Sequence, residues 1–203
     1  MRKLTTFIAV FVLVLGTAPG PALAQNAHFK HGSPKSTDNG LTLTVFGEIA
    51  GLGNGDVRLK VGASGIPIAN CCTNGEQCKV PGQNPAAATV TSATVLIPGS
   101  SLKNWTTPIT VTTEAPETPI PGAPECPNSG WTENILSMAF TQSALRIQQS
   151  SANGATDFSD VITACITYSP ATSDGVVSSA NFSVVVGNAV PIGSCPLSLF
   201  PTF

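Results

Sequence analysis

The sequence predicts an all-β protein held together by disulfides, on three observations. Short segments in which apolar and polar residues alternate recur along the chain, and this alternation is typical of half-buried strands. The 19 glycines and 17 prolines interrupt the chain often enough that no stretch develops a helical period. The six cysteines are an even number, which favours disulfides in an exported chain.

Residues 1–24 have the features of a secretory signal peptide. Arg2 and Lys3 give a positive start, residues 8–15 form a short apolar run, and a small-x-small site ends at Ala24. The apolar run is too short to span a bilayer, so we expect cleavage rather than anchoring. The mature chain is then expected outside the cell or on its surface, with the periplasm as a further possible location and without membrane insertion.

The charge and histidine content exclude several classes of function. The mature chain keeps seven of the nine basic residues and all eleven acidic ones, a balance that argues against nucleic acid and against anionic lipid. Its two histidines, His28 and His31, lie in the polar start. A packed body without histidine cannot form a Ser–His–Asp triad or most zinc centres. We therefore expect no cofactor and no metal.

The mature chain of about 179 residues fits one β domain. Residues 25–40 are polar and without period, which predicts a flexible leader, and residues 41–203 form the domain. Residues 41–49 alternate as a strand, residues 51–56 are a glycine-rich turn, and residues 57–61 alternate again. We expect these two strands to pair as a hairpin.

Six further segments read as strands and are separated by proline-rich connectors. They are residues 89–97, 108–113, 135–140, 144–148, 161–168 and 182–186. Eight or nine short strands at this spacing predict an antiparallel sandwich, most simply one of immunoglobulin-like architecture. A barrel is the alternative, but long connectors suit crossings between two sheets better than tight meanders.

The cysteines are expected to form disulfides rather than a metal site, because the chain has no CxxC pair. The six residues are Cys71, Cys72, Cys78, Cys126, Cys165 and Cys195. Cys71 and Cys72 are adjacent in an extended segment and point to opposite faces, so they should have different partners. Six cysteines allow 15 connectivities, and the sequence pattern alone does not choose among them.

Cys165 lies in a strand that is apolar on both faces. Cys165 and Thr163 share one face, whereas Ile166 and Tyr168 share the other. Two arrangements satisfy this pattern. Either the strand is buried on both faces, or the bulkier set forms the core and Cys165 bridges outward.

A family resemblance rests on several short strings between Leu41 and Val177, through their order and spacing. They include GLGNGDV at 51–57, CTN at 72–74, PGQNP at 81–85, CPN at 126–128 and SPATSDG at 169–175. In these strings the chain resembles a family of uncharacterised small secreted bacterial β-rich proteins. The resemblance implies a secreted β-rich domain, and it implies no particular activity.

The same resemblance bears on the disulfides. The family's framework cysteines match Cys72, Cys126 and Cys165, whereas Cys71 and Cys78 look like additions in this chain. That difference suggests a local bridge between Cys71 and Cys78, a framework bridge between Cys72 and Cys126, and a third bridge between Cys165 and Cys195. Each closed loop would add on the order of 2–4 kcal/mol to stability.

Carboxylates are the remaining groups that could carry chemistry. Asp157 and Asp160 are close in sequence, which suggests two hypotheses, a glycosidase or a calcium site. A glycosidase needs its two carboxylates on opposite sides of a cleft, and nothing in the sequence places these two so. An ordinary acidic turn before a strand is favoured. Asp56 and Asp174 stand beside glycines and are expected to fix turns. A secreted hydrolase would need at least two of these four residues to converge.

Aromatic side chains could stack on sugars if they shared one exposed face. Trp131 begins a strand beside an expected disulfide, and Tyr168 ends one, so both are expected to pack inside. Trp105 lies next to a connector and is the candidate for a ligand contact.

The sequence therefore predicts a secreted non-catalytic surface, matrix or binding module whose loops contact an extracellular protein or a glycan. Three alternatives remain. They are a carbohydrate-binding module, a secreted carboxylate-dependent hydrolase, and a polymerising extracellular structural subunit in which an edge strand or residues 25–39 complete a neighbour.

Overall fold

The structure is a computed structural model that describes residues 26–79, 87–103, 106–117, 126, 128 and 130–203. The expected signal peptide lies outside these residues. The strands are β1 (His28–Phe29), β2 (Lys35–Asp38), β3 (Leu43–Ala50), β4 (Val57–Thr73), β5 (Cys78–Lys79), β6 (Ala88–Thr91), β7 (Val95–Ile97), β8 (Thr107–Thr112), β9 (Trp131–Gln149), β10 (Ser159–Tyr168), β11 (Gly175–Val176) and β12 (Phe182–Gly187). Three 3-10 helices complete the described regular structure, namely η1 (Gly99–Ser101), η2 (Ser179–Asn181) and η3 (Leu197–Leu199).

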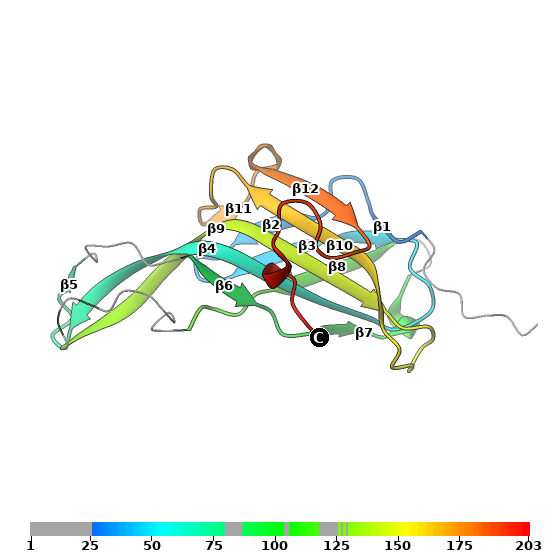
Figure 1. Cartoon of the computed structure of the whole chain (residues 1–203), viewed down its shortest axis with the longest axis horizontal. Coiled ribbons are helices and arrows are strands. Elements are labelled where there is room, and N and C mark those ends of the chain that lie inside the picture. Colours follow the sequence, from blue (N-terminus) through cyan, green and yellow to red (C-terminus); the bar gives the residue numbers. More distant parts are fainter. Residues whose placement is uncertain (1–25, 80–86, 104–105, 118–125, 127, 129) are drawn as a thin grey trace, which may run out of the picture.

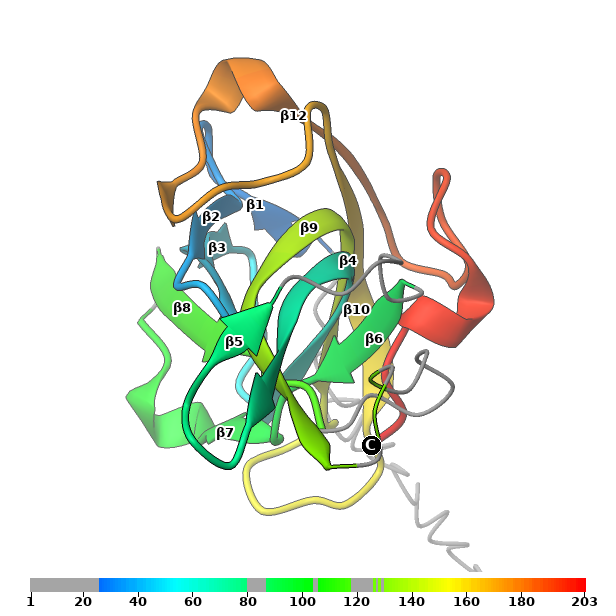
Figure 2. The ribbon, with the colours of Figure 1, turned by 90° about the vertical axis from the view of Figure 1, so that its left-hand side faces the viewer.

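The strands form two antiparallel sheets that face each other in a sandwich-like arrangement (Figure 1). In the first sheet β3 is central, with β8 on one edge and β2 and β1 on the other, and β11 pairs with β2. The second sheet runs β12-β10-β9-β4, and β4 also pairs with β5, β6 and β7. Figure 2 shows β2, β3 and β8 on one side of β4, β9 and β10. The all-β expectation is confirmed at this level.

The main core lies between the two sheets. It is built from aliphatic and aromatic side chains that alternate with polar ones along each strand. Its largest fully buried members include Leu43, Val45 and Ile49 of β3, Val57 and Leu59 of β4, Phe140, Leu145 and Ile147 of β9, and Ile162 and Ile166 of β10. Burying each such side chain contributes about 1.5–3 kcal/mol before the loss of chain entropy is counted.

The expected hairpin between residues 41–49 and 57–61 is wrong. Both segments are strands, but β3 belongs to the first sheet and β4 to the second, so residues 51–56 carry the chain across the sandwich. Alternation shows only that each strand buries one face, and two strands of opposite sheets bury their faces in the same core. Gly51 begins the crossing with φ of +76°, and a Cβ there would lie 2.2 Å from the carbonyl oxygen of Asn26.

The expectation of a flexible leader at residues 25–40 is also corrected. This segment contains β1 and β2, and β2 pairs with β3 over four residue pairs. The inward side chains of β2 are Ser36 and Asp38, which are almost completely buried. The core face of this strand is therefore polar, which is why residues 35–38 show no apolar alternation.

The other predicted segments match strands closely. Residues 108–113, 161–168 and 182–186 correspond to β8, β10 and β12. Residues 89–97 form two short strands, β6 and β7, which pair with different parts of β4. Residues 135–140 and 144–148 belong to one long strand, β9, rather than to two.

Two strands are much longer than the rest. β4 and β9 have 17 and 19 residues and pair along their whole length, from Val57 opposite Gln149 to Thr73 opposite Trp131. β10 pairs with β9 only from Gln142 onward. Residues 65–73 and 131–140 therefore project beyond β10 as a two-stranded ribbon, here called the arm, with β5 at its tip (Figure 1).

The chain after β12 returns over the outer face of the second sheet. Leu199 and Phe200 pack there with Ala144, and the Cys165–Cys195 disulfide ties this segment to β10. Both faces of β10 are thus buried while Cys165 bridges away from the main core, so the structure combines the two arrangements that the sequence allowed. Gly62 permits the close approach, since a Cβ there would lie 2.2 Å from the carbonyl oxygen of Leu199.

Candidate functional site

The three disulfides are Cys71–Cys126, Cys72–Cys78 and Cys165–Cys195. The third pair is the expected one, and Cys71 and Cys72 have different partners, as expected. The pairings Cys71–Cys78 and Cys72–Cys126 are wrong. Cys78 lies directly opposite Cys72 in the β4–β5 pair, and directly opposite residues share one face. Cys71 points to the other face of β4, where it meets Cys126.

The two disulfides of β4 lie near the tip of the arm, where Trp131 also lies. The Lys79 ammonium lies 5.7 Å from the centre of the Trp131 ring, within the range of a cation–π contact. Trp131 is half-buried rather than fully enclosed. This indole is therefore partly covered by a lysine and leaves only part of its surface for a ligand.

The outer face of the arm exposes large aliphatic side chains. Ile66 and Ile68 are 43% and 51% exposed, and Leu136, at the register shift of β9, is 58% exposed. Ile68 is directly opposite Ser137. A groove of about 450 Å³ begins at this pair and is lined by Ile68, Ser137, Ala139, Thr172, Ser173 and Asp174.

A buried carboxylate lies next to this groove. Asp38 accepts hydrogen bonds from the Gly40 backbone N–H at 2.9 Å and from the Thr172 hydroxyl. Thr172 in turn accepts from the backbone N–H of Phe140 at 2.9 Å, which ties the groove's rim to the arm. Burial raises the pKa of Asp38 above its ordinary value, although both hydrogen bonds oppose the shift, and the nearby Asp174 charge adds to it.

A second polar group crosses the core beside it. The Tyr168 hydroxyl lies 2.8 Å from the hydroxyls of both Ser36 and Ser143. Burial raises the pKa of Tyr168 to about 12. The expectation that Tyr168 packs inside agrees with its 4% exposure, so this ring is not a sugar-contacting surface.

The sequence did not predict these two buried hydrogen-bond networks, one around Asp38 and one around Tyr168. Asp38 falls in the predicted leader, and Ser36 and Ser143 carry no sequence signal that distinguishes a buried serine from an exposed one. The available signal was the Asp38-Asn39-Gly40 string, in which an aspartate accepts from the backbone two residues ahead. Its presence predicts an ordered turn rather than a flexible segment.

Asp157 and Asp160 have separate structural partners. Asp160 accepts from the Arg146 guanidinium at 2.8 and 3.0 Å and from Gln148 at 2.7 Å. Burial acts against ionisation, yet these hydrogen bonds and the arginine charge hold the pKa of Asp160 below its ordinary value. Hydrogen bonds from Ser151 lower the pKa of Asp157 as well.

The remaining two carboxylates fix loops. Asp56 accepts from the backbone N–H groups of Gly99 at 2.6 Å and Gly154 at 2.8 Å. Asp174 accepts from the Ser137 hydroxyl at 3.4 Å, beside the groove of the arm. The four carboxylates thus act in separate structural contacts. Within the described part of the chain, no three His, Cys, Asp or Glu residues are grouped so as to hold a metal ion.

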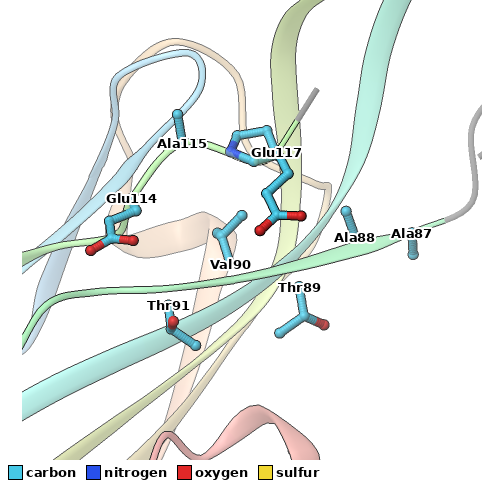
Figure 3. A pocket seen from close by; sticks show the side chains of 9 residues that line it. Ala87, Ala88, Thr89, Val90, Thr91, Glu114, Ala115 and Glu117 are labelled. Carbon is cyan, nitrogen blue, oxygen red and sulfur yellow. The ribbon is translucent and has the colours of Figure 1, made fainter. Parts of the chain in front are cut away.

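Two other hollows occur on the body. One, of about 400 Å³, lies between β6 and the segment after β8, with Glu114 and Glu117 on the same side of β6 as Val90 (Figure 3). The Glu114 backbone N–H donates to the Thr91 carbonyl at 2.8 Å, so the segment follows the edge of β6. The other, of about 580 Å³, is lined mainly by apolar groups of β11, β12 and residues 32–35.

Trp105, the predicted ligand contact, lies outside the described residues. His28 is exposed in β1, and its Nδ1 lies 2.7 Å from the Asn26 carbonyl oxygen. In the described ranges no helix has the length and hydropathy that a membrane crossing requires.

Comparison with known proteins adds no relative. No family model, no curated protein and no solved structure matches this chain. The site must therefore be interpreted from its own geometry.

Proposed function

We propose that the protein is a secreted, non-catalytic binding module that recognises an apolar, uncharged patch on an extracellular protein through the outer face of its arm. The observation that carries the proposal is the exposure of Ile66, Ile68 and Leu136 on a two-stranded ribbon that has two disulfides near its tip. Clustered exposed aliphatic side chains of this kind mark interaction surfaces on soluble proteins.

The charge pattern supports an uncharged partner. From Val61 to Gly75 and from Asn134 to Leu145 the sequence has no Asp, Glu, Lys or Arg. Asp174 lines the groove beside these two segments, which themselves carry no charge. The face of the arm therefore offers little electrostatic attraction to a charged partner, and its gain on binding comes from apolar burial. Glycan binding would instead rely on exposed aromatic faces, and the described aromatic side chains near the arm offer only the partly covered Trp131.

The binding surface can be tested with labelled protein on the producing cells and their secreted matrix. We expect saturable binding that unlabelled protein displaces. The double variant I66S/I68S should bind at least tenfold more weakly, since about half of each side chain would otherwise be removed from water. Leu96→Ser is the matched control, because Leu96 is 59% exposed but lies on β7, away from the arm. Equal loss in both variants, or no saturable binding, would contradict the proposal.

The hydrolase alternative can be tested directly. Asp160→Asn and Asp157→Asn should change stability and leave any cell-binding unchanged, because both carboxylates hold loops or strands in place. A turnover that disappears in either variant while the protein stays folded would favour the hydrolase over the binding module.

One observation favours a second candidate, an extracellular structural subunit. Among the described strands, none but β4 pairs with β9 between Trp131 and Thr141. The backbone N–H groups of Met138 and Phe140 at this edge already donate to Gly40 and Thr172. The part nearer the tip, from Trp131 to Leu136, contains no lysine or proline and is open to strand addition by a neighbour. A concentration-dependent ladder of oligomers in size-exclusion chromatography with light scattering would support the subunit, and a monomer at every concentration would support the binding module.

Three further assignments belong to the same proposal. The antiparallel pairing and the repeated crossings between sheets support an immunoglobulin-like sandwich. The three disulfides are compatible with an oxidising compartment and support export by the predicted signal peptide. We also assign the chain to the family of small secreted bacterial β-rich proteins that its strings resemble.

A further inference from the structure

The three disulfides differ in their access to solvent. Cys165 and Cys195 are 1% and 2% exposed, and Cys71 is 2% exposed. Cys78, by contrast, is exposed, whereas its partner Cys72 is buried. A thiolate that attacks a disulfide must reach one sulfur while the other leaves. Cys126, the partner of Cys71, is half-buried. Cys72–Cys78 is therefore the disulfide whose outer cysteine is the most accessible, opposite an enclosed partner.

The enclosed sulfur has a hydrogen-bond donor. The Asn134 side-chain amide donates to Cys72 Sγ at 3.1 Å. A donor at this position stabilises negative charge on sulfur and so favours departure of Cys72 as a thiolate. The Asn70 Oδ1 atom lies 3.4 Å from the same sulfur and can accept the proton of the thiol that forms afterwards. Both forms of the released sulfur thus have a partner in place.

We propose that Cys72–Cys78 is a thiol-exchange site for an exported dithiol reductant. A thiolate of the reductant forms a bond with Cys78 Sγ while the Cys72–Cys78 bond breaks, and the electron pair passes to Cys72 Sγ, which takes a proton from water. The second thiolate of the reductant then displaces Cys78, which is also protonated. The protein gains two thiols, and the reductant becomes a disulfide.

Opening this bond changes only the tip of the arm. β5 is held to β4 by two residue pairs, Cys71 with Lys79 and Cys72 with Cys78, and within the described ranges it has no other strand partner. Cys71–Cys126 stays closed and continues to fix the arm on its other face. Reduction therefore leaves β5 and the turn before it held by hydrogen bonds alone, such as the one from the Thr73 N–H to the Gln77 carbonyl, while the sandwich keeps its fold.

Reduced glutathione is the probe for the first step. The oxidised, full mature protein is exposed to glutathione near pH 8, alkylated at timed intervals and mapped by mass spectrometry. We expect a glutathione adduct on Cys78 first, then free thiols at Cys72 and Cys78, with the other two disulfides intact. An adduct on Cys72 or Cys126, or reduction of all three disulfides at one rate, would overturn the proposal.

Asn134→Asp tests the role assigned to the donor. This variant keeps the side-chain shape and places a carboxylate against the departing sulfur, so the exchange should slow by roughly tenfold, the effect of one hydrogen bond to a developing charge. Thr132→Val is the control, because Thr132 lies directly opposite Cys72 on β9 without contributing a donor to its sulfur. Thermal melting checks that both variants fold. An Asn134→Asp protein that folds and exchanges as fast as the natural one would overturn the leaving-group role.

Discussion

Tyr168 joins three strands through a single hydroxyl. Ser36 lies on β2 in the first sheet, whereas Ser143 and Tyr168 lie on β9 and β10 in the second. The hydrogen bonds therefore connect the two sheets through the core. A hydrogen bond of this kind adds little net free energy, but a buried group left without its partner is costly.

Tyr168→Phe should lower the free energy of unfolding by about 1–3 kcal/mol, because it leaves the Ser36 and Ser143 hydroxyls unpaired in the core. Urea unfolding followed by circular dichroism measures the change. The triple variant Y168F/S36A/S143A is the control and should recover part of the loss, since it removes the unpaired hydroxyls as well. Unchanged stability in Tyr168→Phe would show that the bridge between the sheets contributes nothing.

Asp38 gives a pH dependence with a definite sign. Its pKa is raised in the folded protein, mainly by burial, so the folded state binds the proton more tightly than the unfolded chain does. Its contribution to stability is fully present below the unfolded pKa of about 3.9 and is lost as the pH rises through the folded pKa.

Asp38→Asn should remove this dependence. We expect the melting temperature of the natural protein, relative to that of the variant, to fall as the pH rises above about 4. Melting curves between pH 3 and pH 7 give the comparison, and the readout is the difference in slope rather than the absolute stability. Parallel curves for the two proteins would contradict the raised pKa.

At the scale of the elements, the sequence located most strands and missed how they pair. β3, β8, β10 and β12 have regular alternation, and alternation depends only on a strand's own two faces. The sheet to which a strand belongs depends on where its connector leads, which is why the β3–β4 hairpin was wrong. β9 was divided because polar Thr141 and Gln142 interrupt its apolar pattern at the point where its environment changes from arm to body.

The candidate site was less predictable than the fold. The sequence indicated that Cys71 and Cys72 face opposite ways, but which partner lies on which face depends on the position of β5, a strand of two residues. The arm has an exposed outer face because β4 and β9 extend beyond the end of β10. No local pattern encodes that difference in length.

The disulfides should differ in their effect on stability because they close loops of different length. Replacing Cys165 and Cys195 by alanine opens a loop with a separation of 30 residues and should cost about 4 kcal/mol. Replacing Cys72 and Cys78 opens a separation of 6 residues and should cost about 2 kcal/mol. Guanidinium unfolding of the two double variants measures both values. The reverse order would show that native-state packing, rather than loop length, decides their contribution.

For the whole molecule, intact mass tests export and oxidation together. The secreted protein should begin at Gln25 and weigh about six mass units less than its fully reduced form, since each of three disulfides lacks two hydrogens. N-terminal sequencing locates the cleavage site. A mass equal to that of the reduced chain would contradict the disulfide pattern, and a retained Met1 would contradict signal cleavage.

The continuity of β4 and β9 has a mechanical consequence. The same two strands form the arm and the middle of the second sheet, and their pairing runs from Val57 to Thr73 with register shifts between Ser64 and Gly65 and between Ile68 and Ala69. If a partner at the tip pulled along the arm, the load would pass lengthwise into the centre of the sandwich. The bonds between the strands would then share the load in shear rather than open one after another. A protein fixed at one end and bound at the other would therefore carry the tension through the paired strands β4 and β9, which lie in line with the force.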